Sequence, residues 1–477
     1  MSYPPLTSDK GTPLLAQNRQ FQWFSEPTYI YPMIPAYAAT ILKNAGHEVI
    51  WDDGIAEELK YETWLHNVQK DSPEIIALET KTPVIKKHWS IIQDIKDNIP
   101  DVKVVLIGDH VTALPRESFN KSKVDFVITG GDFDFLLNNL LDHLEVNRDL
   151  EPGIFFRKKG EISSNGPFQL DHDLNSLPII DRELTKWELY SEKNGNFKKT
   201  PGTYTMIGRD CWWNKCTFCA WTVMCPTYRV GSPEKLSHEI DILKEKYGMK
   251  DIFDDTGTFP IGRWLKKFCK MAIKKRYKDE INLGCNMRFG ALNFENYKMM
   301  KHAGFKLLLF GVESANQKTL DKLNKNTTVQ EIKKSCMNAS KAGLEPHVTI
   351  MFGYPWESEE EAKKTVDLGK YLLRKGFAKT VQATIMIPYP GTPLFKEATE
   401  KGWLRTLDWS EYDMKEPILK TSVQNEIYYE MIQELFGVAF DPEFLIRRVL
   451  SIRSIEDLKF SFRAAKKVIG HLKDFSP

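Results

Sequence analysis

The chain has 477 residues, of which 42% are hydrophobic and 27% charged, and its 66 basic and 64 acidic residues leave a net charge of +2. This balance argues against nucleic acid as the main partner, and no apolar run is long enough for a membrane helix. The first residues lack the features of a secretory signal, so we expect a cytoplasmic protein. At roughly 150 residues per domain, the length predicts about three domains.

Residues 1–150 alternate strand-like and helix-like runs, which predicts a doubly wound parallel sheet covered by helices. The expected helices lie near 35–45, 89–98 and 132–144. The expected strands are 47–51, 74–79, 103–108 and 125–129. No apolar strand is visible in residues 1–5, so we expect the sheet to lack its first strand. Ligands of such folds bind at the carboxyl ends of the strands.

The rest of the chain divides into three further regions. Residues 151–202 are rich in turn formers and predict a hairpin at 153–162 followed by a linker. Residues 203–400 predict a partial (β/α)6 barrel, and residues 401–477 predict a helical C-terminal region. The expected barrel strands are 204–207, 251–254, 282–288, 306–312, 347–352 and 381–387.

The seven cysteines all lie between residues 211 and 336, and Cys211, Cys216 and Cys219 fall within nine residues directly after the first expected barrel strand. An odd count with three closely spaced members favours a metal site over disulfides. Three thiolates on one loop can bind three irons of a 4Fe–4S cluster and leave the fourth iron open. A four-cysteine zinc site that includes Cys225 is the alternative.

The segment Cys216-Thr217-Phe218-Cys219, preceded by Cys211, resembles the cysteine motif of radical S-adenosylmethionine (SAM) enzymes. Nearly the whole chain resembles those members that carry an N-terminal cobalamin-binding domain. The resemblance implies that Cys211, Cys216 and Cys219 hold a 4Fe–4S cluster whose open iron binds SAM. Four residues separate the first two cysteines where the family usually has three. Cys216, Cys219 and Cys225 form a competing set.

The resemblance extends to the residues that end the successive barrel strands. It implies that these residues, with the aromatic residue of the cysteine motif, bind SAM: Phe218, Asp255, Arg288, Glu313 and Ser314. A guanidinium suits the carboxylate of SAM. Asp255 can instead belong to a solvated loop or helix cap, and Arg288 to a surface ion pair.

In the N-terminal region, the resemblance implies a cobalamin site on the loops that follow the strands. The residues concerned are Thr80, Gly108, His110, Thr129, Gly130 and Gly131. Small residues are needed where backbone approaches a ligand closely, although ordinary turns explain them as well. The Asp-x-His-x-x-Gly motif that supplies a histidine to cobalt is absent, so cobalt would be bound without a histidine. His110 is compatible with a cobalt-side group or with a hydrogen-bonding turn residue.

Taken together, these features predict a cobalamin-dependent radical SAM enzyme, most simply a methyltransferase that uses a 5′-deoxyadenosyl radical at an unactivated carbon. A non-methylating rearrangement or cyclisation is the alternative reaction, and a non-catalytic cobalamin- or zinc-binding module is the alternative class. The absence of cysteines before Cys211 and after Cys336 argues against methylthiotransferases and enzymes with C-terminal auxiliary clusters. No catalytic side chain is assigned.

The expected partners are a small-molecule, lipid or peptide substrate and an electron donor such as flavodoxin or ferredoxin. The C-terminal region is basic, and its cations can either face solvent or dock on an anionic membrane. The residues concerned are Arg447, Arg448, Arg453, Lys466 and Lys467. A solvated face is the simpler interpretation.

Overall fold

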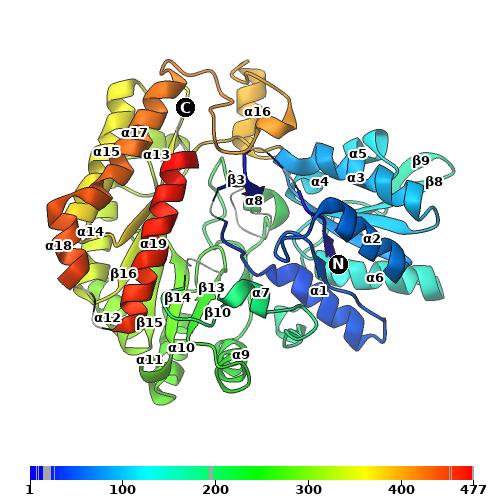
Figure 1. Cartoon of the computed structure of the whole chain (residues 1–477), viewed down its shortest axis with the longest axis horizontal. Coiled ribbons are helices and arrows are strands. Elements are labelled where there is room, and N and C mark those ends of the chain that lie inside the picture. Colours follow the sequence, from blue (N-terminus) through cyan, green and yellow to red (C-terminus); the bar gives the residue numbers. More distant parts are fainter. Residues whose placement is uncertain are drawn as a thin grey trace.

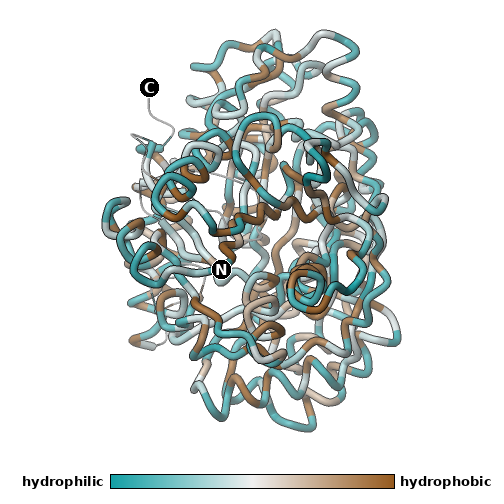
Figure 2. Tube along the Cα trace, turned by 90° about the vertical axis from the view of Figure 1, so that its right-hand side faces the viewer, coloured by the Kyte–Doolittle hydropathy of each residue, from teal (hydrophilic) through white to brown (hydrophobic). Residues whose placement is uncertain are grey.

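The computed structural model describes the whole chain except residues 7, 9, 14–22, 26, 193–196, 451, 453 and 475–477. Two α/β units lie side by side, and the helical C-terminal region lies with the second unit (Figure 1). Hydrophobic segments run through the interior and hydrophilic segments over the outer helices and turns (Figure 2). Among the described residues, no helix is both long enough and apolar enough to span a membrane.

The first unit contains a seven-stranded sheet in which the first five strands are parallel and the last two form an antiparallel extension. Its order is β4 (Asp52–Asp53), β1 (Ser2–Tyr3), β5 (Ile75–Thr80), β6 (Lys103–Gly108), β7 (Phe126–Ile128), β8 (Ile154–Lys158) and β9 (Glu161–Ser164). The helices of this unit are α1 (Met33–Asn44), α2 (Tyr61–Asp71), α3 (Ile85–Asn98), α4 (Asp109–Ala113), α5 (Pro115–Lys121) and α6 (Phe133–Val146).

The expectation that the sheet lacks its first strand is wrong. β1 pairs with β4 on one side and with β5 on the other, so it occupies an interior position of the sheet. The strand has only two residues, too few for a periodic pattern to reveal. The expected strand at 47–51 is also displaced, because the chain pairs only at Asp52 and Asp53.

The second unit contains a six-stranded parallel sheet whose strands follow one another in chain order. The strands are β10 (Gly202–Thr205), β13 (Asp251–Asp254), β14 (Asn282–Met287), β15 (Phe305–Glu313), β16 (Glu345–Phe352) and β17 (Thr380–Ile385). Each of the six expected barrel strands is therefore present. Within the described residues β10 and β17 do not pair, so the sheet is open.

Local sequence explains the helices that connect these strands. Ser232 caps α9 (Pro233–Glu245) ahead of a proline in the first turn, and Thr328 and Ser358 form capping boxes at α14 (Val329–Lys341) and α15 (Glu359–Arg374). The other helices of this unit are α7 (Glu188–Ser191), α8 (Trp221–Met224), α10 (Gly262–Lys274), α11 (Tyr277–Glu280), α12 (Phe294–His302), α13 (Gln317–Lys322) and α16 (Pro393–Glu400).

Two pairs of short strands and three C-terminal helices complete the fold. The two pairs of short strands are both antiparallel: β2 (Thr12–Pro13) with β3 (Trp23–Phe24), and β11 (Gly208–Arg209) with β12 (Arg229–Val230). Residues 401–424 are largely irregular, and helix resumes with α17 (Asn425–Gly437), α18 (Pro442–Leu450) and α19 (Ile455–Asp474).

Buried ion pairs join the two α/β units. Arg209, directly before the cysteine loop, donates from Nη2 to Asp134 Oδ2 at 2.6 Å and from Nη1 to the carbonyl of Gly131 at 2.6 Å. Arg229 on β12 donates to Asp132 at 2.5 and 2.8 Å. Because Asp132 and Asp134 belong to the first unit, these contacts fix the cysteine loop against the carboxyl end of the N-terminal sheet.

Candidate cluster and cofactor site

The three cysteines of the predicted triad lie on one loop between β11 and α8. Their side chains are partly exposed, whereas Cys225 is fully buried. Asp210 and Asn214 have φ values of 62° and 45°, so the loop reverses direction on both sides of Cys211. Cys211 Sγ lies 2.9 Å from Thr258 Oγ1, on the loop that follows β13.

Cys225 faces the first unit instead of its sequence neighbours. A Cβ atom added to Gly131 would lie 2.2 Å from Cys225 Sγ, so the thiol fills the space that a side chain would need there. Burial raises the pKa of Cys225 well above its usual range, and the nearby charge of Asp210 adds to the rise. A buried, protonated thiol of this kind is inert, which disfavours Cys225 as a metal ligand.

Two buried cations lie close to the cysteine loop. Burial raises the pKa of Cys216, and the charges of Lys325 and Arg288 oppose that rise. Arg288 donates from Nη2 to the carbonyl of Lys325, and its guanidinium lies 5.4 Å from the ring centre of Trp212 and 4.9 Å from that of Trp213. Arg288 is only 8% exposed, so it is not a surface ion-pair residue.

The structure separates the two residues of the Glu-Ser pair that ends β15. Glu313 has a φ of 63° and forms a buried ion pair with Lys325. Ser314 instead donates to Glu357 Oε1 at 2.7 Å, and the same oxygen accepts from Asn316 at 3.0 Å. Ser314 is therefore part of a buried hydrogen-bond network, and Glu313 is the member of the pair that lies with the cations.

Asp255 and Phe218 have separate sets of partners. Asp255 Oδ1 accepts from Asn286 Nδ2 at 3.2 Å, and its neighbour Asp254 is the buried carboxylate, which accepts from Thr205 Oγ1 at 2.9 Å. Phe218 packs against an apolar cluster that includes Tyr354 after β16. Lys325 Nζ lies 6.0 Å from the centre of the Phe218 ring. The structure thus brings Phe218, Arg288 and Glu313 toward Lys325, a residue that sequence reasoning missed.

His110 is fully enclosed by protein contacts. Its Nδ1 lies 3.2 Å from Thr82 Oγ1 and its Nε2 lies 3.1 Å from Glu117 Oε2. The edge of its ring meets Trp409 with a 5.4 Å separation of ring centres. Both ring nitrogens are thus engaged, which favours the interpretation of His110 as a hydrogen-bonding residue over that of a cobalt-side group.

The other N-terminal candidates also contact protein groups. Thr80 Oγ1 lies 2.8 Å from Nδ1 of His88, whose burial lowers its pKa to about 3. Thr129 donates to the carbonyl of Gly153 at 2.8 Å, and a Cβ added at Gly130 would lie 2.5 Å from the ring of Phe168. Gly108, with a φ of 122°, would place a Cβ 2.1 Å from the carbonyl oxygen of Thr80. The close packing of the two neighbouring strands therefore requires a glycine at position 108.

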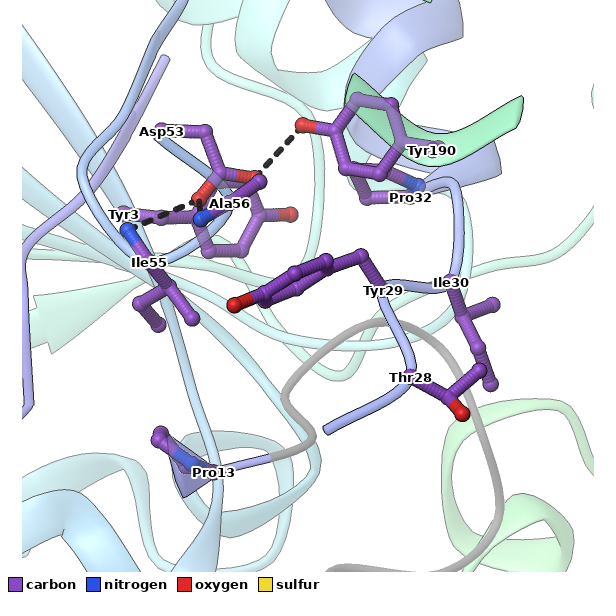
Figure 3. Close-up of a pocket in the computed structure, with 10 residues that line it drawn as sticks. All are labelled: Tyr3, Pro13, Thr28, Tyr29, Ile30, Pro32, Asp53, Ile55, Ala56 and Tyr190. Atoms are coloured by element: carbon purple, nitrogen blue, oxygen red, sulfur yellow. Dashed lines mark hydrogen bonds between the residues drawn. The ribbon is translucent and has the colours of Figure 1, made fainter. Parts of the chain in front are cut away.

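A small pocket opens at the carboxyl ends of β1 and β4 (Figure 3). Asp53 accepts from the hydroxyl of Tyr190 at 2.5 Å and from the backbone of Ala56 at 2.9 Å. Tyr3 lines the same pocket and donates to Glu79 at 2.5 Å. Burial raises the pKa of Asp53 to about 6 and that of Glu79 to about 7. The remaining lining residues are Pro13, Thr28, Tyr29, Ile30, Pro32 and Ile55.

Comparison with known proteins agrees with this arrangement. Residues 205–369 match the model of the radical SAM superfamily. An uncharacterised methyltransferase of Pyrococcus horikoshii is 27% identical over 88% of this chain and 89% of that protein. The anaerobic magnesium-protoporphyrin IX monomethyl ester cyclase of Cereibacter sphaeroides is 26% identical over 82% of this chain and 63% of its own length.

Among solved structures, the radical SAM methyltransferase TsrM from Kitasatospora setae, with cobalamin and a 4Fe–4S cluster bound, superposes with a TM-score of 0.67. The match has 14% identity and covers 93% of this chain and 96% of TsrM, so the likeness is one of fold. The α/β fold class predicted from the sequence is confirmed. Residues 205–369 therefore form a radical SAM domain.

Proposed function

We propose that the chain is a cobalamin-dependent radical SAM enzyme that transfers a methyl group to an unactivated carbon of a small-molecule, lipid or peptide substrate. The observation that carries the proposal is the loop after β11, which carries three partly exposed thiols and whose Cys216 lies within the charge influence of the buried cations Arg288 and Lys325. Proteins with parallel sheets of this kind bind ligands at the carboxyl ends of the strands, and this loop lies at that end of the sheet. The likenesses to a methyltransferase of P. horikoshii and to TsrM support the reaction.

Cys211, Cys216 and Cys219 would hold the 4Fe–4S cluster, which when bound supplies one electron to the sulfonium of SAM. A structural zinc site takes four protein ligands, whereas three thiolates suffice for a 4Fe–4S cluster that keeps one iron open, so the triad fits a cluster better than zinc. The position of Cys225 against Gly131 supports the same choice.

Arg288 and Glu313 would bind the amino-acid end of SAM. Nε of Arg288 is buried and has no hydrogen-bond partner, so a carboxylate can accept from this guanidinium without displacing a protein group. Lys325 holds the Glu313 carboxylate in place by their ion pair, and that carboxylate can accept from an ammonium group. Trp212 and Trp213 cover the guanidinium and limit the access of water.

The cobalamin would lie at the carboxyl edge of the N-terminal sheet, which the Arg209 contacts hold against the cysteine loop. We favour a cobalamin position at the ends of β1 and β5 over one beside Gly130 and Gly131. Phe168 and Cys225 already fill the space beside those two glycines. Tyr3, Asp53 and Glu79 offer buried polar groups near the end of β1. With pKa values near 6 and 7, the two carboxyl groups can donate as well as accept, which suits the amide groups of a corrin.

A non-methylating cyclisation is the second candidate. It is favoured by the 26% identity to the magnesium-protoporphyrin cyclase of C. sphaeroides, which extends over 82% of this chain. Both reactions begin with the same cleavage of SAM, with an electron from a donor such as flavodoxin or ferredoxin. They differ in the fate of the SAM methyl group.

The test is anaerobic reconstitution with iron, sulfide and cobalamin, followed by reduction in the presence of SAM. We expect iron incorporation, bound corrin after gel filtration, and formation of 5′-deoxyadenosine. SAM with a deuterated methyl group separates the two reactions, because only methyl transfer moves the label to cobalamin and onward to a substrate. Failure to form 5′-deoxyadenosine with a full complement of iron would refute the proposal.

Single cysteine variants test the ligand set. We expect Cys211→Ala, Cys216→Ala and Cys219→Ala each to lose the cluster absorbance. Cys225→Ala should keep it, and Cys336→Ala, a buried thiol on α14, is the control for a general loss of stability. If Cys225→Ala loses the cluster while Cys211→Ala keeps it, the competing triad of Cys216, Cys219 and Cys225 is the right one.

A further inference from the structure

The C-terminal helices expose an unusual amount of apolar surface. The structure describes sixteen large hydrophobic side chains as exposed, and nine of them follow residue 439. On α18, Val449 and Leu450 are 65% and 74% exposed, and Leu445 and Ile446 are exposed as well. Contiguous exposed apolar surface on a folded protein marks a site of interaction.

The exposed side chains of α19 fall on one side of that helix. Ile455, Leu458, Phe462 and Ile469 are separated by three, four and seven residues, which places them in a single stripe. We call this stripe the C-terminal apolar surface.

The opposite side of α19 holds the helix to the rest of the protein. Arg463 donates to the carbonyl of Phe197 at 3.0 Å, and Asp474 accepts from the backbone of Ser25 at 3.0 Å. Near its start, Asp457 pairs with Lys198 at 2.7 Å. The helix is therefore anchored along one face, and its apolar stripe faces outward.

A row of lysines borders the apolar stripe. Lys459, Lys466 and Lys473 are exposed and spaced by seven residues, so they lie next to the stripe on the same side of α19. Residues 442–474 contain eight basic and four acidic residues, a net charge of +4 in a chain whose total is +2. An excess of positive charge thus accompanies the exposed apolar side chains.

The basic residues singled out from the sequence differ in part from this row. Arg447 pairs with Glu443 at 2.5 Å, Arg448 lies over the ring of Phe460, and Lys467 donates to the carbonyl of Pro27. Arg453 lies outside the described residues. Lys466 is the one residue common to both sets.

We propose that the C-terminal apolar surface docks the protein on an anionic lipid bilayer. A helix with an apolar stripe edged by lysines lies in the membrane interface, with the stripe among the acyl chains and the ammonium groups at the anionic headgroups. A second copy of the chain fits less well, because a two-fold contact through the stripe brings the two lysine rows together. The proposal concerns where the protein lies, and it does not rest on the proposed function.

The test is co-sedimentation of the full-length holoprotein with lipid vesicles. We expect binding to vesicles of phosphatidylcholine mixed with phosphatidylserine, weak binding to phosphatidylcholine alone, and release at high salt. Phe462→Ser should weaken binding roughly tenfold or more, because it removes a large aromatic ring that becomes buried when the helix docks on the membrane. The triple variant Lys459→Glu/Lys466→Glu/Lys473→Glu should abolish the preference for the anionic lipid.

The matched control is Phe294→Ser, which removes a 37% exposed ring from α12 of the second unit. It should bind vesicles as the unaltered protein does. All variants should form 5′-deoxyadenosine at the unaltered rate, so a failure of docking and a failure of the proposed function are distinguishable. Absence of binding to anionic vesicles would overturn the proposal. The proposal would also be overturned if the protein were a dimer in solution and Phe462→Ser converted it to a monomer. That result would show that the surface binds a second copy of the chain.

Discussion

Arg209 and Asp134 form a fully buried ion pair that joins the two α/β units, with Nη2 and Oδ2 2.6 Å apart and neither side chain more than 1% exposed. Arg209 lies two residues before Cys211, and its partner Asp134 belongs to the other unit. The position of the cluster loop therefore depends on a carboxylate of that unit. Burial would raise the pKa of Asp134, and the charge of Arg209 opposes that rise.

We therefore expect Asp134→Ala to destabilise the protein by about 3–5 kcal/mol, because it leaves the Arg209 charge buried without a partner. Urea unfolding of the apoprotein measures this loss. The control is Asp142→Ala, which breaks the exposed pair with Arg148 and should cost less than about 1 kcal/mol. Equal effects of the two substitutions would contradict the structural role of the buried pair.

The hydroxyl of Thr258 should tune the proposed cluster. In this structure the Thr258 hydroxyl donates to the carbonyl of Gly257 at 2.9 Å and lies 2.9 Å from Cys211 Sγ. A cluster thiolate cannot donate a hydrogen, so once the cluster is bound the hydroxyl would turn its one hydrogen from that carbonyl to Cys211 Sγ. Hydrogen bonds to cluster sulfurs set the reduction potential. We expect Thr258→Val to make the midpoint potential more negative at unchanged iron content, measured by EPR-monitored redox titration, and Thr258→Ser to keep it. An unchanged potential in the valine variant would rule out this role.

Lys325 is expected to position the SAM-binding groups. Lys325→Met removes the partner of Glu313 and the charge nearest Phe218, so we expect the KM for SAM to rise about tenfold or more in the 5′-deoxyadenosine assay. Lys325→Arg should restore most of the affinity. Lys318→Met, at an exposed position on α13, is the control. If the KM for SAM is unchanged and only kcat falls, Lys325 does not position the SAM-binding groups.

His172 should make the stability of the fold depend on pH. Its Nδ1 lies 3.0 Å from Asp132 and its Nε2 lies 3.1 Å from Glu151, so both nitrogens donate only when the ring is protonated. The hydrogen bond to Asp132 raises the pKa of His172 above its ordinary value of about 6.5.

Because the folded pKa is the higher one, this stabilisation is complete below the ordinary histidine pKa and is lost as the pH rises through the folded pKa. The urea midpoint should therefore fall as the pH rises from the ordinary histidine pKa of about 6.5 through the folded pKa of His172. His172→Gln should flatten that part of the profile, whereas His302→Gln, on α12, should leave it in place. A profile that is equally steep in both variants would show that another group titrates.

Sequence patterns predicted the large elements well for a physical reason. Strands such as Phe305–Glu313 and Glu345–Phe352 are buried on both faces, so they read as apolar runs between polar helices. The two-residue β1 carries no such signal, and it forms because Ser2 and Tyr3 can pair with strands 50 and 76 residues away in sequence.

The candidate site was predicted only in part, because side-chain partners depend on tertiary contacts. Arg288 and Glu313 follow strands and could be found from their positions, but Lys325 lies in an irregular segment after α13 and meets them only in three dimensions. Thr258 was missed for the same reason. His110 was marked by its place after a strand, and nothing nearby in the sequence indicates that Trp409 encloses it.

The contact of Cys225 with Gly131 has a practical consequence for anyone who divides this protein. A fragment that begins at residue 203 would retain the six-stranded sheet and all seven cysteines. It would also leave the Cys225 thiol and the Arg209 guanidinium without the surface that covers them. The cluster loop and the N-terminal sheet thus share a buried contact surface, and the radical SAM domain alone is a poor choice for expression or crystallisation.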